Sequence, residues 1–170
     1  MNGLLLGIDL CDDYSQVCCL NPLTGGVQAL KLTEEESSCL IPTAICKKKT
    51  EDVWFVGEEA YRRALLNEGV MVDKLVRMAG KEGTATIEGV KYTAEDMLSR
   101  FVSMLLEMAA RTFENQQVDC LAFSLQQITP QMPDLLVRVA ERCHLPRESV
   151  RVFCHSECFV YYVLSQPREI

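Results

Sequence analysis

The residues best suited to chemistry follow one another near the start of the chain. The apolar run 4–10 has Asp9 near its end, and Cys11, Asp12 and Asp13 come directly after it. An aspartate at the end of a first central strand is a common position for holding a metal-bound or water-bound phosphate. The sequence therefore indicates a candidate site at this acidic turn, which the other elements must position.

Three short strands with tight turns are expected around the acidic turn. They cover residues 4–10, residues 14–20 and, roughly, residues 26–32. The stretch Asn21-Pro22-Leu23-Thr24-Gly25-Gly26 joins the last two and is rich in turn-forming residues. Together these strands predict an antiparallel meander, followed by a polar, acidic segment over residues 33–38.

Residues 38–92 are expected to form a small subdomain inserted into a single domain that spans residues 1–170. Strands are predicted over 41–46 and 53–56, on either side of a polar tip. The lysines of that tip are expected to be solvated: Lys47, Lys48 and Lys49. A helix over 58–67 would bury Ala60, Ala64 and Leu65, and a hairpin would cover 84–92, whereas residues 70–78 remain undecided between helix and strand.

The rest of the chain alternates helices with strands. Thr93, with Asp96 three residues later, resembles the capping box of a helix whose apolar face continues to about Arg111. A strand over 118–124 follows, and then a helix that starts at Thr129-Pro130. The buried side of this helix would contain Leu136, Val139, Ala140 and Cys143. The last two elements are a strand over 150–154 and a helix over 156–164. Right-handed crossovers would place the two late strands beside the first. This order predicts an α/β fold of the ribonuclease-H-like type, with a mixed five-stranded sheet of order 3-2-1-4-5 and helices on both faces.

Charge and hydropathy argue against a nucleic-acid-binding protein and against a membrane protein. The net charge of −7 argues against a nucleic-acid binder, which would normally present a basic face. No apolar run approaches the roughly 20 residues that span a bilayer, and no basic segment precedes the first leucines as in a signal peptide. We therefore expect a cytoplasmic protein that contacts neither nucleic acid nor membrane.

Nine cysteines raise the question of disulfides or a metal. Their number is odd and they contain no C-x-x-C pair, so a reduced protein is expected. The cluster Cys154-His155-x-x-Cys158 could supply three zinc ligands without an evident fourth. We expect these residues to belong to the core instead.

Several short motifs, taken in their order, resemble the N-terminal lobe of the actin-like ATPase superfamily, which includes actin, sugar kinases and, as the nearest likeness, heat-shock chaperone ATPases. The likeness covers nearly the whole chain. The motifs are Gly7-Ile8-Asp9-Leu10 with Tyr14-Ser15-x-Val17, Ile41-Pro42-Thr43, Val56-Gly57-x-x-Ala60, residues 122–125, Ala140-Glu141-Arg142-Cys143-His144-Leu145, and residues 150–163.

The resemblance implies a nucleotide site between two lobes, with ATP and Mg²⁺ as cofactors. Asp9 would organise the magnesium and the attacking water, and Lys74 would be the family's catalytic lysine. An acid or amide after the last strand would position the water, and either His155 or Glu157 could stand there. Phosphates would lie along the first hairpin, at Asp9, Cys11, Asp12, Asp13 and Tyr14.

The first phosphate-binding loop departs from the family pattern. Cys11 replaces a glycine that lets the backbone approach phosphate, and Asp12 and Asp13 would repel phosphate oxygens unless a metal intervened. The second phosphate hairpin and the adenosine pocket of the family belong to another lobe, which these 170 residues do not contain. We expect no ATP binding or hydrolysis by this chain alone, and a second lobe or another protein as its partner.

Two alternatives remain open at this point. The chain could be a non-catalytic interaction module that keeps only the fold. It could also hold a divalent metal at Asp9, Asp12 and Asp13 for phosphotransfer or nuclease chemistry, although such enzymes need carboxylates from several strands.

Overall fold

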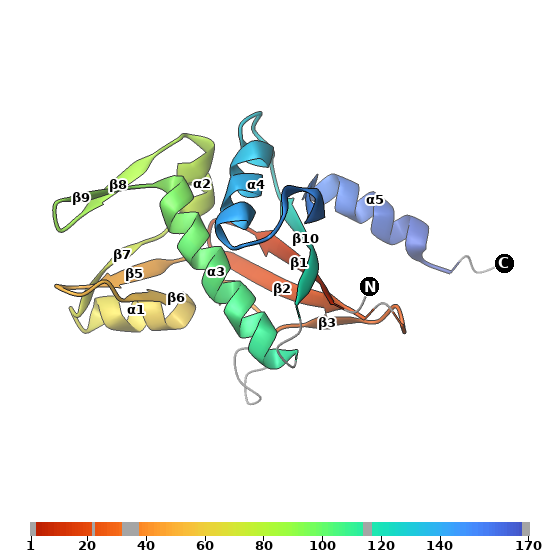
Figure 1. Cartoon of the computed structure of the whole chain (residues 1–170), viewed down its shortest axis with the longest axis horizontal. Coiled ribbons are helices and arrows are strands. Elements are labelled where there is room, and N and C mark those ends of the chain that lie inside the picture. The colour runs from red at the N-terminus through yellow and green to blue at the C-terminus, as the bar shows by residue number, and fades with distance from the viewer. Residues whose placement is uncertain (1–2, 22, 32–37, 114–116, 168–170) are drawn as a thin grey trace.

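A computed structural model describes residues 3–21, 23–31, 38–113 and 117–167 (Figure 1). The protein is mixed α/β, built on a six-stranded sheet. Five strands lie in the order β11-β10-β1-β2-β3, and β4 pairs separately with β2. Their bounds are β1 Leu4–Leu10, β2 Tyr14–Leu20, β3 Val27–Ala29, β4 Ile41–Pro42, β10 Val118–Leu125 and β11 Val150–Cys154. The third strand is therefore much shorter than predicted, and most of the predicted acidic segment 33–38 lies outside the described residues.

Strand directions in this sheet are mixed. β1 and β2 are antiparallel, as a tight hairpin requires, whereas β1, β10 and β11 are mutually parallel. Asp9 on β1 lies level with Ser124 on β10, and Ser124 with Phe153 on β11. The carboxyl ends of three neighbouring strands therefore meet at one edge, beside the turn 11–13.

Alternation along β1 separates a covered face of the sheet from a more open one. Leu4, Leu6, Ile8 and Leu10 are buried, while the residues between them, Asp9 included, are half-buried. The buried set packs against α3 (Ala94–Thr112) and α4 (Met132–Arg142), which lie in front of the sheet in Figure 1. Asp9 therefore belongs to the open face.

Residues 38–92 add a second, smaller sheet with its own helices. Its strands lie in the order β6-β5-β7, and a separate hairpin pairs β8 with β9. The bounds are β5 Ile45–Lys48, β6 Trp54–Val56, α1 Gly57–Leu65, β7 Gly69–Val72, α2 Leu75–Gly80, β8 Thr84–Ile87 and β9 Val90–Thr93. The undecided stretch 70–78 thus contributes first to a strand and then to a helix. Ile45, Val56 and Leu75 belong to the same apolar core as the main sheet.

Three expectations for this segment are wrong. The predicted strand over 41–46 is divided into β4 and β5 at Thr43, whose hydroxyl makes a buried 2.7 Å hydrogen bond with Ser15. Lys47 lies at the end of β5 with only 8% of its surface exposed, so it is not part of a solvated tip. Leu65 is 86% exposed at the end of α1, where the helix has passed the edge of the core.

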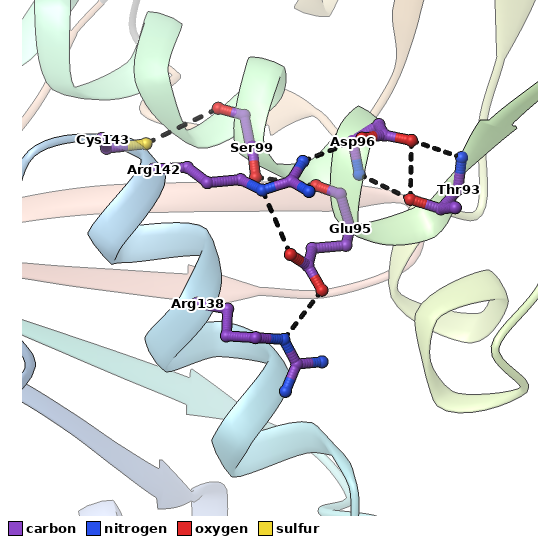
Figure 2. A network of polar contacts seen from close by, with 7 residues as sticks. All are labelled: Thr93, Glu95, Asp96, Ser99, Arg138, Arg142 and Cys143. Carbon is purple, nitrogen blue, oxygen red and sulfur yellow. Dashed lines mark hydrogen bonds and ion pairs between the residues drawn. The ribbon is translucent and has the colours of Figure 1, made fainter.

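Helix α3 starts as its capping pattern predicts. The Thr93 hydroxyl accepts a hydrogen bond from the backbone N–H of Asp96 at 3.1 Å, and the Asp96 carboxylate accepts one from the backbone N–H of Thr93 at 2.8 Å. Figure 2 shows how the same helix end is tied to α4: Arg142 contacts Asp96 and Glu95, and Arg138 contacts Glu95. The last residue of the predicted buried side of α4, Cys143, donates its thiol to the Ser99 carbonyl at 3.6 Å.

Helix α4 begins two residues later than the sequence predicts. Gln131, not Thr129, precedes its first turn, and Pro133 rather than Pro130 occupies the early position that suits proline. The Thr129 carbonyl accepts from the N–H of Met132 in a turn ahead of the helix. The Thr129 hydroxyl is buried and has no hydrogen-bond partner among the described residues.

The last helix, α5 (His155–Ser165), contains no buried residue. It projects away from the remainder of the molecule (Figure 1). It packs on β11 through an edge-to-face pair between Tyr161 and Phe153, with ring centroids 5.9 Å apart. Its first residue, His155, contacts Asp9 on the open face. No helix in the described ranges is long and apolar enough to cross a membrane.

Candidate functional site

Asp9 is the centre of a polar cluster at the carboxyl edge of the main sheet. Its Oδ1 accepts a hydrogen bond from the Ser124 hydroxyl at 2.7 Å and lies 2.6 Å from Nε2 of His155. Its Oδ2 lies 3.9 Å from the Cys11 sulfur. The Asp9 and His155 side chains are about 40% exposed, at 41% and 39%. The cluster joins β1, the hairpin turn, β10 and the first residue of α5.

The two further aspartates of the turn point to α2 instead. Asp12 accepts hydrogen bonds from the Arg77 backbone N–H at 2.8 Å and from its Nε at 3.1 Å. Asp13 forms an ion pair with Lys74. Each added negative charge in the turn is thus matched by a positive charge from the segment 74–77. The carboxylates of Asp9, Asp12 and Asp13 do not form a common metal-binding group in the described part of the chain.

Lys74, the expected catalytic lysine, is engaged by this pairing. It precedes α2 in a left-handed conformation, with φ of 54°, which is uncommon for a residue with a side chain. The hydrogen bond and charge of Asp13 raise the pKa of its ammonium group, so it stays protonated. The structure therefore brings Lys74 to the hairpin, but to Asp13 and not to Asp9.

His155 and Glu157, the alternatives for one catalytic position, have different roles here. Glu157 accepts a 2.8 Å hydrogen bond from the backbone N–H of Cys154 and closes the first turn of α5 as a capping residue. This bond lowers the pKa of the Glu157 carboxyl. Only His155 reaches Asp9, because it is the residue at which β11 turns into α5.

The thiols around Asp9 are held in the protonated form when no ligand is present. Burial and, next, the charge of Asp9 raise the pKa of Cys11. Burial and the same carboxylate raise the pKa of Cys158, one helical turn after His155. The expected burial of Cys154, His155 and Cys158 in the core is wrong, because all three are only half-buried. Nor do these three residues form a metal-binding group in the described part of the chain. His155 instead converges with Asp9 and Cys11, the three ligand atoms lying within 4.8 Å of one another.

Two hollows flank the hairpin. One of about 370 Å³ lies between the turn and α2, and its lining includes Cys11, Asp12, Arg77 and Thr129. The other, of about 530 Å³, contains the expected phosphate contact Tyr14, which is 50% exposed, together with Asp13 and Tyr61. Both are therefore lined by the carboxylates that the family resemblance would place against phosphate.

Two contacts of the site were not predicted. Ser124 could have been inferred, because it stands at the carboxyl end of a strand expected to be parallel to β1, where such ends meet. Arg77 could not, since it is 65 residues from Asp12 in an ambiguous segment.

Fold and site together define a mixed α/β domain with an Asp–His–Cys–Ser cluster at the carboxyl edge of its sheet. The chain belongs to the family described as a family of unknown function (DUF5716), C-terminal, which it matches over residues 27–170. The β1–β2 hairpin with Asp9 and Cys11 precedes the matched residues, whereas Lys74, Ser124, His155 and Glu157 lie within them. No curated protein matches this sequence.

Proposed function

We propose that this chain is a lobe of the actin-like ATPase type that keeps the architecture, does not bind ATP and acts as a protein-interaction module. The architectural part is supported by the strand path β11-β10-β1-β2-β3, with β1 antiparallel to β2 and parallel to β10. An insertion between the meander and the first long helix, and an aspartate at the carboxyl edge of the central strand, are further points of agreement.

The observation that carries the loss of ATP binding is the internal pairing of the hairpin charges. Asp13 is paired with Lys74, and Asp12 with both the backbone and the side chain of Arg77. A triphosphate entering the turn would have to displace these carboxylates from their cations. As long as the two carboxylates keep their positions, their negative charges repel those of the triphosphate. The carboxylates of Asp12 and Asp13 therefore pair with the cations that an external anion would otherwise contact.

The interaction role is supported by the surface of α5. Six consecutive residues, Phe159 to Leu164, are each more than half exposed, and each is apolar or aromatic. A helix that is apolar on all sides is normally enclosed by protein. An exposed apolar surface of this kind is typical of a docking site for another protein.

Chemical-shift mapping by NMR with millimolar Mg·ATP tests the state of the turn. Because the proposal attributes the loss of binding to the two ion pairs, the native chain should show no localised shifts at the amides of residues 11–14. The double variant Asp12→Ser, Asp13→Ser frees Lys74 and Arg77 and should show them. Asp134→Ser, which removes an exposed ion pair on α4, is the matched control and should behave like the native chain.

Localised shifts in the native chain that disappear in Asp9→Asn would contradict the proposal and favour a nucleotide half-site. Absence of shifts in the double variant would show that the ion pairs are not the obstacle.

A further inference from the structure

Three different metal-ligating side chains meet at one point on the open face of the main sheet. Asp9 comes from β1, Cys11 from the hairpin turn and His155 from the start of α5. One ligand atom from each lies within 4.8 Å of the other two. The sequence places His155 more than 140 residues from the other two, so only the fold brings the group together.

The chemistry of this donor set distinguishes between metals. Magnesium and calcium prefer oxygen ligands and take several of them, whereas this group offers one carboxylate, one thiol and one imidazole. A set of sulfur, nitrogen and oxygen donors is typical of zinc, which is usually four-coordinate. Zinc sites with three protein ligands leave one position for water or another ligand.

We propose that Asp9, Cys11 and His155 bind a Zn²⁺ ion with one open coordination position, linking the β1–β2 hairpin to the start of α5. This inference does not depend on the proposed interaction role. Binding would replace the Cys11 thiol proton, which passes to solvent, by a bond from sulfur to zinc.

The observed separations are compatible with such a site. Zinc bonds of about 2.0–2.3 Å in tetrahedral directions hold ligand atoms about 3.3–3.8 Å apart. The Cys11 sulfur is 3.9 Å from Asp9 Oδ2, close to this range. Nε2 of His155 lies 2.6 Å from the other oxygen of Asp9, Oδ1, and must exchange this direct contact for zinc, while all three ligand atoms already lie within 4.8 Å of one another.

Ser124 has the position of an outer-shell partner. Its hydroxyl donates to Asp9 Oδ1 at 2.7 Å from the neighbouring strand. Hydrogen bonds of this kind orient a ligating carboxylate, and their loss typically weakens metal binding by about 10–100-fold. We infer that Ser124 is a positioning residue for this site.

Titration of the metal-free chain with Co²⁺, a spectroscopic substitute for Zn²⁺, tests the proposal directly. The native chain should develop the visible bands of a four-coordinate cobalt ion together with a near-ultraviolet sulfur-to-cobalt charge-transfer band, and stoichiometric Zn²⁺ should abolish both. Cys11→Ser should lose the charge-transfer band. His155→Ala should weaken binding by more than about 100-fold, since a direct ligand matters more than an outer-shell partner. Ser124→Ala should keep the band but weaken binding by about 10–100-fold.

Cys120→Ser is the matched control, because this half-buried thiol lies on β10 outside the cluster, paired with Leu5 of β1. It should bind cobalt as the native chain does. Far-ultraviolet circular dichroism of each variant verifies that the fold is retained. A native chain without a charge-transfer band, or a band that survives Cys11→Ser and disappears in Cys120→Ser, would overturn the assignment.

Discussion

Lys47 is a charged residue that the fold encloses almost completely. Its ammonium group donates to Glu88 Oε2 at 2.9 Å and to the carbonyls of Glu51 and Lys48 at 2.9 and 3.3 Å, so each of its three N–H groups has an acceptor. Glu88 also accepts from the backbone N–H of Thr50 at 3.0 Å. The hydrogen bond from Lys47, followed by that from Thr50, lowers the pKa of Glu88. One lysine thereby joins the β5–β6 turn to the β8–β9 hairpin.

Lys47→Ala should lower the thermal unfolding midpoint by several degrees, because it leaves the Glu88 carboxylate and the two carbonyls without their donor. Lys48→Ala is the matched control in the same lysine run, since its ion pair with Glu51 is exposed and contributes little. Differential scanning calorimetry of the two variants gives the comparison. Equal midpoints would mean that Lys47 is not a structural link.

At the scale of elements, the contact between α3 and α4 depends on one acidic helix end. Asp96 accepts hydrogen bonds from the Thr93 backbone and hydroxyl and from Nη1 of Arg142 at 2.8 Å (Figure 2). Burial raises the pKa of this carboxyl, but the hydrogen bonds from Arg142 and Thr93 outweigh it and lower the pKa to about 2. The charged form is therefore the one that the folded state stabilises.

Asp96→Asn should reduce the free energy of unfolding at pH 7 by about 1 kcal/mol, less than the pKa shift alone would give, because solvent screens a side chain that is 34% exposed. A folded-state pKa below the unfolded value gives stability that is complete above pH 4 and is lost as the pH falls through about 2. Urea denaturation at pH 7, 4 and 3 should therefore show the difference from the native chain shrinking only in the acid range. Asp134→Asn, with a more exposed carboxylate, should show little difference at any of these values. A constant difference for Asp96→Asn would contradict the argument.

Elements whose signals are local could be predicted from the sequence, and contacts between distant segments could not. The Thr93–Asp96 cap and strands β1, β2, β10 and β11 follow from spacing and from apolar runs, and they occur where predicted. The start of α4 was predicted wrongly, because Pro130 and Pro133 both suit a first helical turn. At the candidate site, Asp9 was recognised from its place on β1. Its pairing with His155, and that of Asp12 with Arg77, required the tertiary fold.

At the scale of the whole molecule, the apolar side chains of α5 are set apart from the interior core. Strands of the main sheet, α3, α4 and parts of residues 38–92 contribute to a single core, in which Phe101 and Phe123 are fully buried. The aromatic side chains of α5 remain outside it, and Phe159 is 67% exposed. Exposed aromatic side chains of this kind add little to the stability of the folded chain, and aromatic residues often contribute most to the binding of another protein.

Two phenylalanine-to-alanine variants compare how much the core and α5 contribute to the free energy of unfolding. Phe101→Ala should lower the free energy of unfolding by about 3–5 kcal/mol, because it removes a fully buried ring and leaves a cavity. Phe159→Ala should change it by less than about 0.5 kcal/mol, as is usual for exposed positions. Urea denaturation followed by tryptophan fluorescence provides both values, since Trp54 is the only tryptophan and contacts the core. A large loss in Phe159→Ala would mean that α5 packs on its own chain, and its apolar surface would then no longer support a docking role.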